Sequence, residues 1–367
     1  MTEEITVETA AHWRAMPATR LLDGGMDYAD IVLLERATRD GVAWDVAAER
    51  LGNLRLEVAE AARKGGHTVT ARNAFRAAAA DFVFAQMAIN ADTERKRDLY
   101  EGFSAAVGAA AALSPASMHK IELPFVGGRL VGWHVIPDRS TVLGTVIVFG
   151  GQSGWGATYL RYADALAARG LATILAEGPG QGETRLRYRV HLDVDVAAAY
   201  GEFVGYAAES GAPVGIWGNS VGGLFAALTA ARNDDIDACC VNGAFAAPRL
   251  LSFRTFREQA AAMLGTSDET AIERNFRRLA FDPVKEQIRC PLLVLHGGAD
   301  PLVSLEDQQP FLDGADDAML QVWDDGEHTI YNHADERNDL VADWFADRLT
   351  TSSRDGMGTM ELADRER

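Results

Sequence analysis

The segment Gly218-Asn219-Ser220-Val221-Gly222 is the part of the sequence best suited to covalent chemistry. It matches the pattern G-x-S-x-G, in which a serine sits on a sharp turn between a strand and a helix. The strand-like PVGIW precedes it and the helix-like LFAALTAARN follows it, so the required context is present. The two outer glycines leave space where side chains would collide with the neighbouring strand or helix. We therefore expect Ser220 to be a nucleophile.

A serine hydroxyl is a weak nucleophile and needs a base, which in turn needs an orienting acid. Asp300 follows the strand-like PLLVLHG, at the carboxyl end of a strand, where open α/β sheets place their sites. His328 follows the next strand-like segment, MLQVWDD. The order Ser220, Asp300, His328 predicts a catalytic triad. His333, five residues later, is the competing base.

Attack on a carbonyl creates an oxyanion that needs at least two preorganised N–H donors. Val221, directly after the nucleophile, is expected to supply one. The second is expected from the loop GGQSGWG after an earlier strand, where we choose the Gln152 amide. Trp155 and Tyr159, in and just after this loop, are candidates for lining an aromatic substrate pocket, with core packing as the alternative.

The elements that must position these residues are strands alternating with helices. Each strand is a continuous apolar run, which predicts a mostly parallel, doubly wound α/β sheet covered on both faces. A hairpin at Gly127-Gly128 opens the sheet. The predicted strands that follow are Thr145 to Gly150, Ala172 to Gly178, Pro213 to Gly218, Ala238 to Gly243 and Pro291 to Gly297.

The part of the chain before this sheet is Ala-rich and periodic like amphipathic helices, with segments such as 42–62 and 71–89. Its aromatic residues Phe75, Phe82 and Phe84 predict a helix face that another part of the chain covers. We divide the chain into an N-terminal arm (1–25), a helical cap (26–113), a catalytic domain (114–350) and a polar, disordered tail (351–367).

Composition narrows the classes of partner. The formal net charge of −18 over 367 residues opposes binding to nucleic acid or an anionic membrane surface. The acidic first residues and the lack of a long apolar stretch predict a cytoplasmic protein. Three cysteines give no disulfide framework, and the histidines show no metal-ligand spacing, so we expect no metal and no cofactor. The expected partner is a small-molecule substrate; formation of a homodimer is left open.

The sequence resembles one branch of the α/β-hydrolases, that of dihydroxypseudooxynicotine hydrolase and the fungal pigment hydrolases that shorten polyketides. The resemblance covers roughly residues 25 to 350 and rests on GGQSGWG, EGPGQGE (177–183), GNSVGG, HGGADPLVS and DGEHTIYNH. It implies an α/β-hydrolase fold whose N-terminal helical segment packs over the active site as a cap.

The resemblance also implies hydrolysis of a carbon–carbon bond beside a carbonyl, in β-dicarbonyl or acyl-aromatic substrates, by a triad of Ser220, Asp300 and His328. In the nicotine-pathway relative a further functional glutamate follows the strand after the elbow helix. The matching stretch here, 243–250, contains no carboxylate. A carboxylesterase or thioesterase is therefore the main alternative, and a binding or isomerase-type protein on the same fold is the other.

Overall fold

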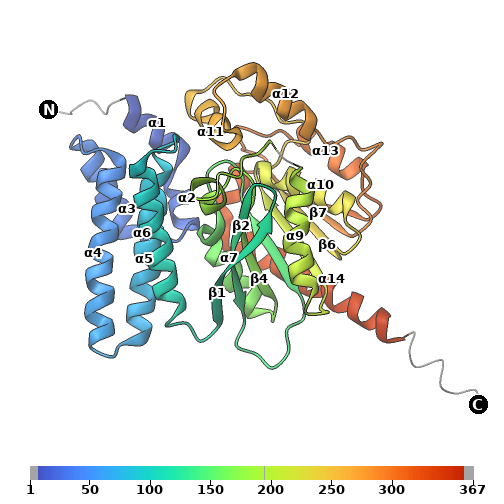
Figure 1. The fold of residues 1–367 in the computed structure, drawn as a ribbon, viewed down its shortest axis with the longest axis horizontal. Coiled ribbons are helices and arrows are strands. Elements are labelled where there is room, and N and C mark those ends of the chain that lie inside the picture. Colours follow the sequence, from blue (N-terminus) through green and yellow to red (C-terminus); the bar gives the residue numbers. More distant parts are fainter. Residues whose placement is uncertain (1–6, 194, 359–367) are drawn as a thin grey trace, which may run out of the picture.

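An eight-stranded sheet forms the centre of the molecule (Figure 1). The computed structural model describes residues 7–193 and 195–358. The strands lie in the order β1-β2-β4-β3-β5-β6-β7-β8. Pairs β1–β2 and β2–β4 are antiparallel and the remaining pairs are parallel. The predicted mostly parallel α/β sheet is thereby confirmed. The strands are β1 Ser117–Phe125, β2 Gly128–Ile136, β3 Thr145–Phe149, β4 Ala172–Glu177, β5 Val214–Asn219, β6 Ala238–Asn242, β7 Leu292–Gly297 and β8 Ala318–Trp323.

Every residue of the five strands β3 to β7 is buried, as continuous apolar runs require when both faces of a sheet are covered. One face packs on α7 and α14, and the other on α9 and α10. The helices within and after the sheet are η1 Gly156–Tyr159, α7 Leu160–Ala168, α8 Gly182–Leu186, α9 Val196–Ala208, α10 Val221–Arg232, α11 Arg254–Leu264, α12 Glu269–Leu279, α13 Leu305–Asp313, η2 His328–His333 and α14 Ala334–Gly358.

The N-terminal region is helical, and its longer helices lie side by side next to the sheet (Figure 1). Asp27 and Thr93 cap the first turns of α3 and α6 with their side chains, as residues at N-caps do. The predicted helices 42–62 and 71–89 are α4 and α5 with slightly shifted ends. The N-terminal helices are α1 Val7–Ala15, α2 Ala18–Asp23, α3 Tyr28–Arg39, α4 Trp44–Lys64, α5 Thr68–Met87 and α6 Glu94–Ala111.

The aromatic side chains of α5 are buried, as expected, and more than one element covers them. Phe75, Phe82 and Phe84 are each at most 5% exposed. Phe82 packs against Gly52 of α4 and Gly102 of α6, where a side chain would crowd its ring. Phe84 packs against Gly24, just after α2. The bundle thus covers Phe82 itself, whereas the N-terminal arm covers Phe84.

Both ends of the chain are partly described. The predicted N-terminal arm, 1–25, contains α1 and α2, and residues 1–6 lie outside the described residues. The predicted disordered tail, 351–367, begins within the last turns of α14, and from residue 359 onward it lies outside the described residues. In the described part of the chain no helix is both long and apolar enough to cross a membrane.

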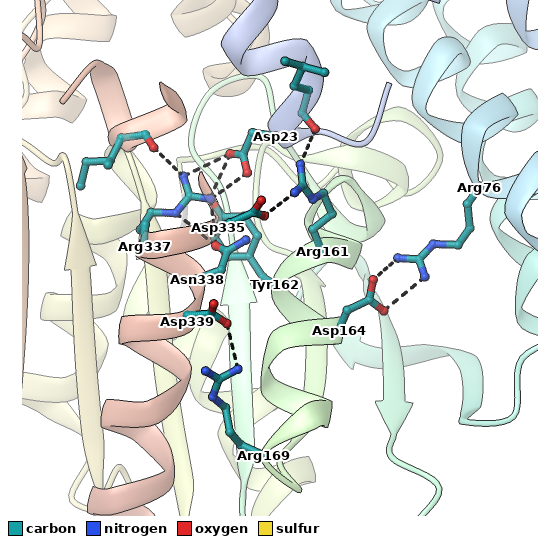
Figure 2. A network of polar contacts seen from close by, with 12 residues as sticks. Asp23, Arg76, Arg161, Tyr162, Asp164, Arg169, Asp335, Arg337, Asn338 and Asp339 are labelled. Carbon is teal, nitrogen blue, oxygen red and sulfur yellow. Dashed lines mark hydrogen bonds and ion pairs between the residues drawn. The ribbon is translucent and has the colours of Figure 1, made fainter. Parts of the chain in front are cut away.

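A buried ion pair joins α2 to the end of the sheet domain (Figure 2). Arg337 on α14 is fully buried and donates from Nη2 to Asp23 Oδ1 at 2.7 Å. Its Nη1 donates to the carbonyl of Thr329 at 2.7 Å, and its guanidinium lies 4.5 Å above the ring of Tyr162. The same arginine therefore holds the N-terminal helices and the backbone just after His328.

A nearby ion pair offers a contrast, because Arg161 pairs with Asp335 at the surface, where the Asp335 side chain is 83% exposed (Figure 2). Exposed pairs contribute about 0–1 kcal/mol, whereas removing one partner of a buried pair leaves an uncompensated charge. Replacing the aspartate of each pair by asparagine should therefore lower the free energy of unfolding much more for the buried pair than for the surface pair.

We predict that Asp23→Asn lowers the free energy of unfolding by about 3 kcal/mol, because it leaves Arg337 buried without its counter-charge. Asp335→Asn, the matched surface change, should cost less than about 1 kcal/mol. Chemical denaturation of both variants measures the difference. Equal stabilities of the two variants would contradict the role assigned to Asp23.

Candidate active site

The turn after β5 holds Ser220 in a backbone conformation that side chains rarely adopt, with φ 57° and ψ −136°. The Ser220 N–H donates to the carbonyl of Asn242 on β6 at 2.8 Å, which anchors the turn. A side chain at Gly218 would collide with the carbonyl of Gly222, and one at Gly222 with the carbonyl of Gly150. The glycines of the G-x-S-x-G pattern are therefore required sterically, as the sequence predicts.

His328 lies within hydrogen-bond distance of both Ser220 and Asp300. His328 Nε2 is 3.0 Å from Ser220 Oγ, and His328 Nδ1 is 2.8 Å from Asp300 Oδ2. The Asp300 side chain is fully buried, and its Oδ1 accepts from the N–H groups of Leu302 and Val303. These bonds leave one Asp300 oxygen to orient the imidazole, so the arrangement matches a nucleophile, base and acid in series.

The competing histidine faces elsewhere. His333 Nε2 is 2.9 Å from Asp325 Oδ1, and its other ring nitrogen is 3.5 Å from Glu336. Both partners are exposed carboxylates at the start of α14 and in the preceding loop. The geometry therefore favours His328 over His333 as the base for Ser220.

Two buried asparagines connect the strand of the nucleophile to the histidine loop. Asn219 donates to the carbonyl of Phe149 at 3.1 Å and accepts from Asn242 at 2.9 Å. The same Asn242 amide donates to the carbonyl of Thr329, the residue after His328, at 3.1 Å. Sequence reasoning did not identify this series of hydrogen bonds. The usable signal was an asparagine at the end of each of two neighbouring apolar strands.

The loop that carries Gln152 packs against the turn that carries Ser220 and Val221. Gly151 packs directly against Ser220 and Val221, because a side chain there would approach the Val221 nitrogen to 3.0 Å. Neither the Val221 N–H nor the Gln152 N–H donates to an acceptor elsewhere in residues 7–193 and 195–358. Both N–H groups are therefore unpaired in the described residues, as the predicted role of oxyanion donor requires.

Gln181, which sequence reasoning did not select, controls the orientation of this loop. Its Nε2 donates to the carbonyls of Gly150 at 2.6 Å and Gly151 at 3.0 Å. Its Oε1 accepts from Gly178 N–H and Tyr200 Oη, so the fully buried amide uses all its hydrogen-bonding groups. In a trans peptide the C=O and the next N–H point in opposite directions. Because Gln181 holds the Gly151 carbonyl, the Gln152 N–H points away from the Gln181 side chain.

Trp155 and Tyr159 differ in their relation to the site. Trp155 is 2% exposed, donates from its indole to the Gly151 carbonyl at 3.3 Å and, with Gln152, lines a small cavity. Tyr159 is held beneath the loop, with its hydroxyl close to Gly150 and Gly154 and its ring against Tyr162. Each residue therefore lines a small cavity, Trp155 beside Gln152 and Tyr159 beside Arg20 and Tyr331.

Helix α2 crosses from the oxyanion loop to the histidine loop. Arg20 donates to Ser153 Oγ at 2.7 Å and lies 5.6 Å from the ring centre of Tyr331. Thr19 donates to Glu327, next to His328, at 2.5 Å. These contacts come from the N-terminal arm, 1–25, and not from the segment predicted as the cap.

Glu177 lies at the carboxyl end of β4, where it opens the motif EGPGQGE. Burial and the neighbouring charge of Glu183 raise the pKa of this carboxyl to about 7. Glu177 accepts hydrogen bonds from the Tyr100 hydroxyl and from the Glu183 N–H. A side chain at Gly156 or Gly182 would collide with it. The motif therefore packs a carboxyl against α6 and keeps the loop around Gln181 in place.

Comparison with known proteins identifies the fold of the chain. A family model described as serine aminopeptidase, S33, matches residues 140–274, which include Ser220. The crystal structure of a 2,6-dihydroxy-pseudo-oxynicotine hydrolase superposes with a TM-score of 0.80 over 91% of this chain and 96% of that one, at 23% identity. The chain has the α/β-hydrolase fold.

Curated relatives extend the similarity to sequence. A 2,6-dihydropseudooxynicotine hydrolase from Paenarthrobacter nicotinovorans is 26% identical over 346 residues, covering 91% of this chain and 92% of the relative. The α/β hydrolase pydG from Acremonium sp is 28% identical over 216 residues, which is 54% of this chain and 50% of that protein. The structure of AbyA5 is similar in fold, with a TM-score of 0.62, 18% identity, and coverage of 80% of this chain and 92% of that one.

We predict that Gln181→Ala lowers kcat of this α/β-hydrolase by about tenfold or more with little change in KM, because one oxyanion donor is worth about 10²–10³ and loses its orientation. Affinity for a trifluoromethyl ketone, which forms an oxyanion on the serine, should fall in parallel with kcat. An unchanged affinity for this inhibitor together with a raised KM would mean that Gln181 only shapes the substrate pocket.

A second prediction separates the two histidines. His328→Ala should slow fluorophosphonate labelling of Ser220 by about 10²-fold or more, because the serine loses its base. The labelling rate of His333→Ala should remain within about threefold of that of the unchanged protein, since the partners of His333 are exposed carboxylates. Mass spectrometry of the labelled peptides gives both rates. Equal slowing in the two variants would contradict the assignment of His328.

Proposed function

We propose that this chain is a serine-dependent hydrolase that cleaves the carbon–carbon bond beside a carbonyl in a small aromatic or polyketide-like β-dicarbonyl or acyl-aromatic metabolite. The observation that carries the proposal is the 3.0 Å approach of His328 Nε2 to Ser220 Oγ, with Nδ1 on the buried Asp300. The choice of a carbon–carbon bond is supported by the similarity to 2,6-dihydropseudooxynicotine hydrolase over most of both chains.

In the first half of the proposed reaction, Ser220 Oγ attacks the substrate carbonyl carbon and its proton passes to His328 Nε2. The carbonyl π electrons become an oxyanion, which accepts hydrogen bonds from Val221 N–H and Gln152 N–H. When the oxyanion re-forms the carbonyl, the carbon–carbon bond breaks. Its electron pair moves into the neighbouring carbonyl, which becomes an enolate, and the acyl group stays on Ser220.

In the second half, the imidazolium of His328 returns its proton to the enolate carbon and a neutral ketone leaves. Water then attacks the acyl-enzyme while His328 accepts a proton from it. Collapse of the second oxyanion releases a carboxylic acid and restores Ser220. Asp300 keeps the imidazole oriented and stabilises its charge through both halves.

The proposed setting is cytoplasmic, with a small molecule as the substrate and without nucleic acid or membrane partners. Cys239, Cys240 and Cys290 are free thiols, which suits a reducing compartment. The net charge of −18 opposes nucleic acid and anionic membranes. Formation of a homodimer is left open.

Esterase activity is the competing function, and its leaving group makes a different demand. An ester expels an alkoxide, which the protonated His328 neutralises directly. A β-diketone expels an enolate, whose negative charge develops on an oxygen that the triad does not contact. The stretch 243–250, where the nicotine-pathway relative has its extra glutamate, contains no carboxylate in this chain.

We predict that kcat/KM for benzoylacetone exceeds that for the matched phenyl ester, because a site adapted to an enolate binds its transition state more tightly. Measurable ester hydrolysis should remain as a side activity, since the same triad attacks both carbonyls. Ser220→Ala should abolish both activities, by about 10³-fold or more, and serves as the control. If the ester is preferred by tenfold or more, about 1.4 kcal/mol in the transition state, carbon–carbon cleavage is the wrong reaction.

A further inference from the structure

A small cavity beside the oxyanion loop contains two buried cations. It is lined by Gln152, Ser153 and Trp155 from the loop, by Arg185 from α8, and by side chains of the N-terminal helices and α11. Its volume is about 10 Å³. A space of this size holds one water-sized group. The side chains from the N-terminal helices and α11 are Met87, Asn90, Lys96 and Gln259.

Lys96 and Arg185 lie against the same tryptophan. Lys96 Nζ is 5.1 Å and Arg185 Cζ is 4.7 Å from the ring centre of Trp155. The two side chains are 2% and 1% exposed. Burial and the charge of Arg185 lower the pKa of Lys96 well below its ordinary value. Two buried cations thus line the same cavity as the proposed oxyanion donor Gln152.

One carboxylate faces these two cations. Asp92 lies 3.1 Å from Arg185 Nη2. Glu258, the next acidic side chain on this side, bonds Asn90 and pairs with Arg254 at the surface. Lys96 Nζ donates three hydrogen bonds, which requires the ammonium form, and with it Lys96, Arg185 and Asp92 sum to one positive charge. Burying a charge without a counter-charge is costly, so the site favours a ligand that brings a negative group.

Two buried donors in the cluster, Arg185 Nε and Gln86 Nε2, have no acceptor within residues 7–193 and 195–358, and of these two residues only Arg185 lines the cavity. Lys96 Nζ uses its three donors on the Gln86 carbonyl, the Gln86 side chain and the Ile89 carbonyl. Arg185 Nη1 donates to the carbonyl of Gly180 at 3.1 Å. Arg185 Nε, by contrast, is buried and has no hydrogen-bond partner. Buried N–H groups are almost always paired in native structures, so an unpaired one beside a cavity indicates a missing ligand acceptor.

From this cluster we infer that the cavity binds the second oxygen of a β-dicarbonyl substrate, the one that becomes anionic as an acidic enol or as the departing enolate. This inference rests on the proposed function and names the group that stabilises its leaving group. Arg185 supplies the hydrogen bond and Lys96 adds positive charge. A cavity of about 10 Å³ fits one oxygen atom and excludes a ring.

When the carbon–carbon bond breaks, its electron pair ends on the oxygen beside Arg185 while the original carbonyl re-forms at Val221 and Gln152. An ester has no oxygen at this position that gains charge. Arg185 should therefore matter for ketones and not for esters.

The first experiment compares Arg185→Met and Arg185→Lys with Arg187→Met as the matched control. Arg187 lies two residues away, is 63% exposed and does not line the cavity. Arg185→Met should lower kcat/KM for benzoylacetone by at least tenfold and that for 4-nitrophenyl acetate by less than threefold. Arg185→Lys should restore part of the ketone activity, and Arg187→Met should change neither activity. Equal loss of both activities in a folded Arg185→Met protein would overturn the inference, as would unchanged ketone cleavage.

A second experiment uses the unaltered protein, so it decides the question even if Arg185→Met fails to fold. Ester hydrolysis is inhibited competitively with 4-hydroxy-6-methyl-2-pyrone, an acidic enol, and with its 4-methyl ether. The ionised enol should bind at least tenfold more tightly than the ether, and equal inhibition would overturn the inference. An enzyme that prefers the enol but cleaves no β-diketone would refute the proposed function and leave the anion site standing. Cleavage of β-diketones without any preference for the enol would support the proposed function and refute the anion site.

Discussion

The strained backbone at Ser220 is the constraint on which the site depends. A non-glycine residue held at φ 57° and ψ −136° costs of the order of 1–3 kcal/mol and persists only when its surroundings fix it. Here the Ser220 N–H is bound to Asn242, and the glycines on either side allow β5, α10 and the loop after β3 to approach closely. The strain places Oγ above the carboxyl edge of the sheet, where His328 and the oxyanion loop can reach it.

Three separate links then bring distant segments to this serine. Asn219 and Asn242 join the nucleophile strand to the backbone after His328. Gln181 holds the two carbonyls that orient the oxyanion loop. Arg337 ties the histidine loop to Asp23 and so to the N-terminal helices. Each link is a buried polar group that hydrogen-bonds two segments far apart in the chain, and such bonds are strong in a buried environment.

The sequence predicted the sheet, the N-terminal helices and the relative order of Ser220, Asp300 and His328, because these follow from apolar runs and from a motif with a steric requirement. It did not identify Gln181, Arg185 or Lys96, whose importance depends on contacts between segments far apart in the chain. Likewise, α2 lies in a segment that resembles a simple arm, yet Arg20 and Thr19 contact the loops on both sides of the site.

A covalent acyl-enzyme on Ser220 is the central claim, because water activated by His328 could in principle attack the same carbonyl without one. Rapid acid quenching during turnover of benzoylacetone, followed by mass spectrometry of the peptides, measures this directly. The account predicts that the peptide containing Ser220 carries the acyl group early in turnover, while the methyl ketone is released before the acid. Simultaneous release of both products, with no acyl group on Ser220 at any time, would contradict it.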